Sequence, residues 1–287
     1  MILATLLSVV PFFQPIQEDP KPVERTECSS RVSLPMLPGH RSAPLIELSI
    51  GGKPYHFLLD TGAQGGRISP AIVESLGIQP IGEITAGDPS GKGERQVKIY
   101  SIPEIDAGSA KFYGVSMFAD AGPQGGPAGL ADGVISAGMF QDLLLTLDYP
   151  GKQVVFEPGS LPSSAISYSL MHGLPALPIQ IGNVKLMGHV DSGSDGGLMV
   201  PLKYKSQLPL DGGAKVIGKA RTLFNEITIY GAKVKGPITI GGMAINVPMI
   251  EMHDMFPVGN IGGKVLSQYK VTLDQKHKRI QFEKPAI

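Results

Sequence analysis

The chain has 287 residues, with 37 Gly and 25 Pro, and its 25 Lys+Arg balance its 25 Asp+Glu, so the formal net charge is zero. The many glycines and prolines exclude a long helical bundle or coiled coil, because both residues break helices. Hydrophobic residues make up 42% of the chain, which excludes a disordered protein, and the balanced charge provides no basic field for nucleic acid. The composition therefore predicts a turn-rich, mainly β protein. The single Cys28 can form neither an internal disulfide nor a thiolate metal cage.

The first residues of the chain are almost wholly apolar. Residues 1–13 read MILATLLSVVPFF, which is too short to span a bilayer but suits the apolar core of a signal peptide. We therefore expect residues 1–20 to be a signal peptide and the protein to be exported, either to the periplasm or into the medium. A misassigned start or a buried N-terminal strand is the alternative. Residues 21–43, rich in Pro and charge, are predicted to be a linker.

An internal repeat begins at Pro44 and again at Pro175, 131 residues later. Each copy starts with alternating apolar residues, which predict a strand, and each continues to an Asp-[Thr/Ser]-Gly block, DTGAQGG or DSGSDGG. The repeat resumes at an offset of 126, where 133–135 (GVI) parallel 259–261 (GNI) and 146–148 (TLD) parallel 272–274 (TLD). We expect the change of offset to be an indel in a hairpin loop. Two copies of about 115 residues are too few for a solenoid. They predict two lobes related by a pseudo-two-fold axis, at 44–158 and 169–287, joined by a linker at 159–168.

Shorter elements follow the first Asp block. Ser69, Pro70 and Gly77 suit the cap, the first turn and the stop of a helix of about seven residues. Residues 96–102 and 225–230 are predicted strands, because Ile, Val, Tyr and Thr favour strands. The turn residues at 88–91 (DPSG) predict a hairpin, which would form a flap within 84–102 with its tip near 88–93. Tyr100, on this hairpin, is expected to pack on the strand rather than at the tip.

The two Asp blocks carry the chemistry. One Asp-[Thr/Ser]-Gly triplet is most often only a turn. Two triplets at matching positions of a duplicated domain are more informative, because the pseudo-two-fold axis would bring Asp60 and Asp191 face to face. His189 lies two residues before Asp191 on the same strand face, where we expect a structural role. Asp195 is expected to be exposed to solvent.

Both halves resemble the retropepsin/pepsin-like aspartic proteases, whose signature is an apolar pair followed by Asp-[Thr/Ser]-Gly. Here the two copies read LLDTG at 58–62 and, less fully, HVDSG at 189–193. The stretch DTGAQGGRISPAIVESLGI resembles the bacterial branch of the family. The blocks DGVISAG and GNIGG resemble the apolar-apolar-Gly element that closes each lobe, with Ser136 standing where the family usually has Gly. The resemblance implies an all-β fold of two acid-protease β-barrel lobes with short helices, in a single-chain enzyme.

The resemblance also implies roles for individual residues. Asp60 and Asp191 would share one proton and activate a water that attacks a peptide bond. Thr61 and Ser192 would interlock with the backbone of the opposite loop. Gly62 and Gly193 would leave room for the close approach and donate N–H groups to the carboxylates. The Ser194 hydroxyl would bond the outer oxygen of Asp191 and make the two aspartates inequivalent.

The implied activity is an aspartic endopeptidase acting on a peptide or protein, with no metal or organic cofactor and no nucleic acid. One chain carries both halves of the site, so catalysis would not require a homodimer. One alternative is a catalytically inactive peptide-binding or assembly module on the same fold. Another is an unrelated duplicated β-sandwich, which would leave Asp60 and Asp191 far apart.

Overall fold

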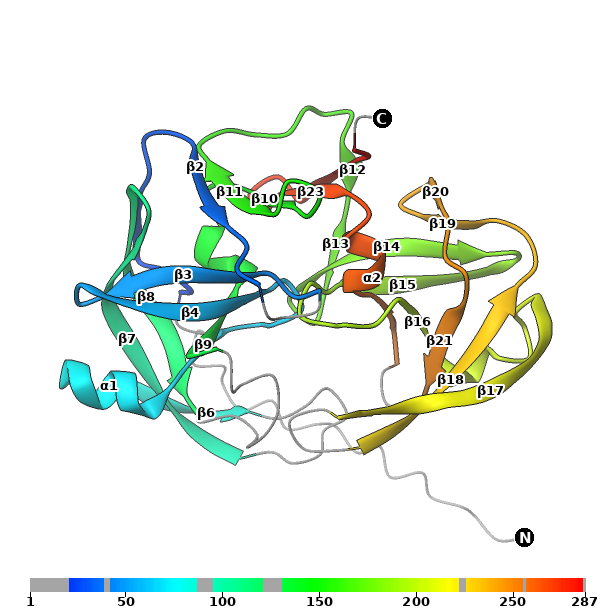
Figure 1. Cartoon of the computed structure of the whole chain (residues 1–287), viewed down its shortest axis with the longest axis horizontal. Helices are drawn as coiled ribbons and strands as arrows, with labels where there is room; N and C mark the ends of the chain where they lie inside the picture. The colour runs from blue at the N-terminus through cyan, green and yellow to red at the C-terminus, as the bar shows by residue number, and fades with distance from the viewer. Residues whose placement is uncertain are drawn as a thin grey trace, which may run out of the picture.

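A computed structural model describes residues 21–38, 42–86, 95–120, 131–221, 226–254 and 257–285. Two β lobes lie side by side, with a third sheet bridging them at the top of the view (Figure 1). The predicted all-β duplicated fold is therefore confirmed. The predicted signal peptide, residues 1–20, and the predicted flap tip lie outside the described residues. Within the described part of the chain, no helix has the length and apolar character needed to cross a membrane.

The first lobe is a closed barrel. Strands β8, β5, β9, β4, β3 and β7 are hydrogen-bonded in that order, and pairing of β7 with β8 closes the ring. The lobe also contains α1 (Pro70–Leu76) and a 3-10 turn, η2 (Ala137–Phe140). Its strands are β1 (Arg25–Glu27), β3 (Leu45–Ile50), β4 (Lys53–Asp60), β5 (Gly66–Ile68), β6 (Gly82–Ala86), β7 (Arg95–Ala107), β8 (Ala110–Ala119) and β9 (Gly133–Ser136).

The second lobe repeats this pattern with two of its strands interrupted. Strands β18 and β19 together correspond to the long strand β7, and β20 and β21 together correspond to β8. Strand β14 pairs with β19 in the same way that β3 pairs with β7. The lobe also contains η3 (Leu202–Tyr204) and α2 (Gly263–Leu266). Its strands are β13 (Ser169–Met171), β14 (Leu174–Ile181), β15 (Val184–Val190), β16 (Leu198–Pro201), β17 (Leu210–Arg221), β18 (Glu226–Val234), β19 (Ile238–Ile240), β20 (Met243–Ile245), β21 (Ile250–His253) and β22 (Gly259–Ile261).

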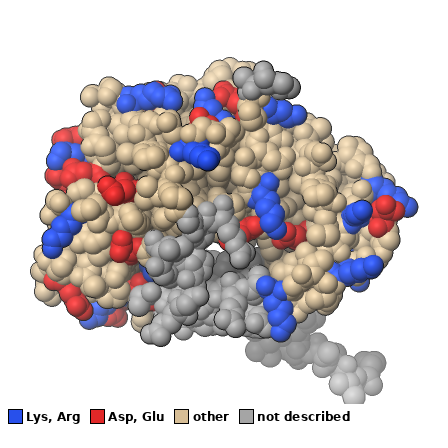
Figure 2. All heavy atoms as spheres, in the orientation of Figure 1, with Lys and Arg blue, Asp and Glu red and all other residues tan. Residues whose placement is uncertain are grey.

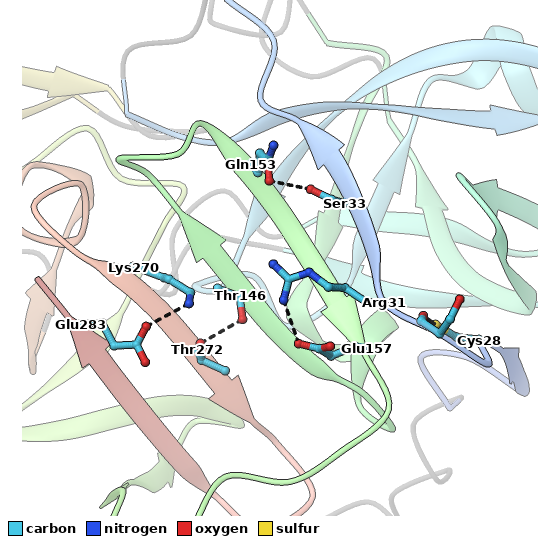
Figure 3. Close-up of polar contacts among 10 residues, drawn as sticks. Cys28, Arg31, Ser33, Thr146, Gln153, Glu157, Lys270, Thr272 and Glu283 are labelled. Carbon is cyan, nitrogen blue, oxygen red and sulfur yellow. Dashed lines mark hydrogen bonds and ion pairs between the residues drawn. The ribbon is translucent and has the colours of Figure 1, made fainter. Parts of the chain in front are cut away.

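A six-stranded sheet joins the lobes across the pseudo-two-fold axis. Its central strands β10 and β23 are antiparallel, with Thr146 opposite Thr272, and the two threonine hydroxyls are 2.9 Å apart (Figure 3). These threonines are equivalent in the repeat, so the register itself is symmetric about the axis. In order, the strands are β12 (Ile166–Ser167), β24 (Arg279–Glu283), β23 (Lys270–Asp274), β10 (Leu144–Asp148), β11 (Gln153–Glu157) and β2 (Val32–Pro35).

Two segments predicted as linkers contain strands. Residues 21–43 supply β1, which pairs with β8, and β2, which pairs with β11. One ion pair lies along this edge, between Arg31 and Glu157 at 3.1 Å (Figure 3). The interlobe segment 159–168 likewise includes β12, which pairs with β24. Edge strands need only one hydrogen-bonded side, so they tolerate the proline and charge that suggested a linker.

The local predictions around the first Asp block are confirmed. The helix α1 spans Pro70–Leu76 and ends at Gly77, whose φ of 64° is the left-handed conformation that glycine adopts readily. Strands β7 and β18 contain most of the residues predicted to be extended. Tyr100 is half-buried on β7, opposite Met117. Connections differ in length at more than one point between the lobes: the one after β8 runs from Asp120 to Asp132, whereas the equivalent one after β21 runs only from Asp254 to Val258.

On the face shown in Figure 2, lysine and arginine side chains lie interspersed with aspartate and glutamate. Most of that face is formed by other residues. On this face, the described residues therefore form neither a basic nor an acidic patch.

Candidate active site

The two Asp loops meet between the lobes. Asp60 is the last residue of β4, and Asp191 directly follows β15. A Cβ added to Gly62 would lie 2.6 Å from Cγ of Asp191, and one added to Gly193 would overlap the carboxyl group of Asp60. Each glycine therefore packs flat against the opposite aspartate, where a hydrogen atom fits and a methyl group does not. The two aspartates therefore lie beside each other where the loops meet, which excludes the unrelated sandwich.

Thr61 and Ser192 hold the two loops together. The Thr61 hydroxyl donates to the carbonyl of Val190 at 2.6 Å, and the Ser192 hydroxyl donates to the carbonyl of Leu59 at 2.7 Å. Each hydroxyl also accepts the main-chain N–H of the other residue at 3.0 Å. Both side chains are fully buried, so all four bonds are shielded from water. This reciprocal arrangement fixes the spacing of the aspartates that precede them.

Main-chain groups and one side chain donate to the carboxylates. Gly62 N donates to Oδ1 of Asp60 at 2.7 Å, and Ser194 N donates to Oδ1 of Asp191 at 2.9 Å. The side-chain amide of Asn260, on β22, donates to Oδ2 of Asp191 at 2.6 Å. Such donors stabilise the ionised form of a carboxyl group.

The pKa values of Asp60 and Asp191 are both raised above those of ordinary carboxyl groups. Burial, followed by the negative charge of Asp191, raises the pKa of Asp60 to about 8. Burial also raises the pKa of Asp191, against the opposing effect of the Asn260 amide and the Ser194 N–H. Since two neighbouring carboxylates repel each other, the pair holds one proton near neutral pH. Its titration belongs to the pair rather than to either residue alone.

The predicted role of Ser194 is wrong. Its hydroxyl accepts the main-chain N–H of Gly196 at 3.2 Å, and only its own main-chain N–H reaches Asp191. The second oxygen of Asp191, Oδ2, is instead bound by the side-chain amide of Asn260, which the sequence reasoning missed. A signal was present, because Asn260 is the polar member of the block GNI whose counterpart in the first lobe, GVI, has Val134.

Two further polar residues near the second Asp loop, Asp195 and His189, contact neighbouring side chains. Asp195 was expected to be exposed, but it is half-buried and accepts the main-chain N–H and the hydroxyl of Ser42 at 3.1 and 2.9 Å. The rings of His189 and His172 are 5.7 Å apart, edge to face. Burial lowers the pKa of His189, and its Nε2 is buried without a hydrogen-bond partner.

A cavity of about 390 Å³ lies beside the first Asp loop. Its wall includes Thr61, Ala63 and Gln64 of that loop, together with residues around the β13–β14 turn such as Leu170 and Gly173. A second cavity, of about 580 Å³, is lined by Tyr269 and its neighbours and includes no residue of either Asp loop. Within the described residues, no group of three or more His, Cys, Asp and Glu side chains is arranged to hold a metal ion.

Residues 46–147 match a protein-family model described as aspartyl protease. The match starts in β3, contains the Asp60 loop and ends in β10. The match supports the resemblance to retropepsin-like aspartyl proteases that the first Asp block indicates, and the second Asp block lies outside the matched residues. This match supports an aspartic protease function in general terms. No match is found among the curated proteins.

Proposed function

We propose that the protein is an aspartic endopeptidase in which Asp60 and Asp191 together activate a water molecule for attack on a peptide bond. The observation that carries this proposal is the close approach of the Asp60 and Asp191 loops, which the reciprocal Thr61 and Ser192 bonds hold together. A partly buried pair of acids that shares one proton has both an ionised base and a protonated acid at the same pH. This arrangement suits general acid–base catalysis.

In the proposed reaction, the ionised carboxylate takes a proton from water while the water oxygen bonds to the scissile carbonyl carbon. The π electrons move to the carbonyl oxygen, which the protonated carboxyl group stabilises by donating its proton. The tetrahedral intermediate then collapses: the C–N bond breaks and the amine leaves with a proton from the first carboxyl group. The shared proton is required, so activity should fall as pH rises through the raised pKa of Asp60, about 8. Since one chain supplies both aspartates, the proposed reaction needs no second subunit.

The proposal is tested with a library of peptides derived from a whole proteome. The wild-type protein should generate new N-termini, which mass spectrometry detects after labelling of amines. Retention of peptides on the protein without any new terminus, across acidic to neutral pH, would instead support the inactive peptide-binding or assembly module. Failure both to cleave and to bind at any pH would contradict both functions.

Alanine at Gly62 should lower kcat by at least about 100-fold, the smaller end of what a positioned acid or base contributes. The added methyl group would collide with the carboxyl of Asp191, and the colliding atoms belong to a side chain held by hydrogen bonds. Gly65 provides a matched control in the same loop, because a Cβ there would meet no atom within 4 Å. Kinetics of both variants are compared after thermal unfolding shows that each is folded. Equal activity of Gly62→Ala and Gly65→Ala would contradict the proposed close approach.

A further inference from the structure

The two lobes are symmetric in backbone but not in what surrounds each aspartate. In the first lobe, β9 runs parallel to β4 and places Val134 beside Leu58. In the second, β22 runs parallel to β15 and places Asn260 beside His189. These registers make Val134 and Asn260 equivalent positions of the repeat. One lobe therefore has an apolar side chain where the other has an amide.

The amide acts on only one member of the pair. Asn260 Nδ2 lies 2.6 Å from Oδ2 of Asp191, while Ser194 N bonds Oδ1, so both oxygens of Asp191 accept hydrogen bonds from their own lobe. On the other side Gly62 N donates to Oδ1 of Asp60, and the side chain of Val134 has no donor group. An NH₂ group can only donate, so it favours a carboxylate oxygen over a protonated one.

We propose that Asn260 is a positioning residue that keeps Asp191 ionised and leaves the shared proton on Asp60. This inference rests on the proposed peptidase function and assigns its two roles. Asp191 would take the proton from the attacking water and later pass it to the leaving amine. Asp60 would donate its proton to the carbonyl oxygen and recover it from that oxygen when the intermediate collapses. Each proton that leaves a carboxyl group is thereby returned within one turnover.

Other titratable groups surround this site and define the controls. The groups that act on the pair or lie beside its loops are Tyr149 after β10, His189 on β15 with His172 facing it, Asp195, and Glu251 on β21 paired with Lys264. Histidine has the ordinary pKa closest to neutrality among these residue types, and His189 is the histidine on β15, the strand that leads to Asp191. A change in the pH profile must therefore be shown to come from Asn260 and not from this imidazole.

The test measures kcat/KM against pH for wild type, Asn260→Val and Asn260→Asp. Valine reproduces the residue of the first lobe, and aspartate keeps the shape of asparagine while removing the donor. In both variants the acidic limb of the profile should move to higher pH, by about one pH unit or more, because a hydrogen bond to a charged group is lost. At a fixed pH below that limb, activity should fall about tenfold when the limb moves by about one pH unit. His189→Gln is the control and should leave the limb in place.

Three results would overturn the inference. An unchanged limb in both Asn260 variants would show that the amide does not set the ionisation. A move to lower pH would show that the Asn260 carbonyl oxygen accepts a hydrogen bond from protonated Asp191, instead of its NH₂ group donating one to the carboxylate. A limb that moves only in His189→Gln would assign it to the imidazole.

The ionisation of the two aspartates can also be measured in the absence of substrate. In protein labelled with ¹³C at aspartate carboxyl groups, the Asp191 signal should titrate at lower pH than that of Asp60, and Asn260→Val should raise the midpoint of Asp191. The reverse order of midpoints in wild type would overturn the inference even if the protein cleaves peptides. A wild-type protein that shows the expected order but cleaves nothing would contradict the proposed function alone.

Discussion

Asparagine at either position 60 or 191 should abolish peptide cleavage while leaving the fold intact. Each carboxyl group is required as an acid or a base in both halves of the proposed reaction, and an amide can do neither. A positioned acid or base contributes about 10²–10⁴-fold, so a loss of at least about 1000-fold in kcat is expected for each variant. Asparagine has the shape of aspartate. The Thr61 and Ser192 bonds that join the loops involve main-chain partners and stay in place.

Initial rates on a peptide that wild type cleaves provide the measurement. Asp211→Asn is a suitable control, since Asp211 is an exposed surface aspartate that pairs with Lys235 at 3.6 Å. This control should retain wild-type kcat. Cleavage retained by Asp60→Asn or by Asp191→Asn would show that the pair is not the catalytic centre, even if the protein proved to be a peptidase of another kind.

The overall fold was predictable because the sequence contains an internal repeat. The constant offset around Asp60 and Asp191 required equivalent backbone at both sites, and the threonines of the two TLD blocks do face each other across the axis. Composition gave no comparable help with β1 and β2. Short edge strands need no alternating pattern of their own, because the sheets they join supply the hydrogen-bond partners.

The polar surroundings of the aspartates were harder to predict. Ser194 is three residues from Asp191, but the path of its loop turns the main-chain N–H, and not the hydroxyl, toward the carboxylate. Asn260 reaches the same carboxylate from 69 residues away, through a parallel strand pair that neighbouring sequence does not reveal. A repeat indicates which backbone positions correspond. It does not indicate which side-chain contacts form where the two copies have different residues, because those contacts depend on how the folded chain packs.

A second large effect is expected on stability at alkaline pH. The pKa of Asp60 is raised from 3.8 to about 8, first by burial and then by the charge of Asp191. Between these values the folded protein holds a proton that the unfolded chain has released, so the free energy of unfolding must fall as pH rises. The stabilisation from the protonated acid is complete below about pH 4 and is lost as pH passes through about 8.

Asp60→Asn removes this titration and places an NH₂ donor opposite Asp191. At pH 9 the variant should therefore be more stable than wild type, by on the order of 3 kcal/mol once relaxation of the site is allowed for. Near pH 4 the two proteins should have similar stability. Urea unfolding of both proteins at these two pH values measures the difference, and Asp211→Asn should follow wild type at both. A stability difference that does not change with pH would show that the carboxyl groups are not coupled as a buried pair. The same comparison separates stability from catalysis, because the variant expected to be inactive is also the one expected to be more stable at alkaline pH.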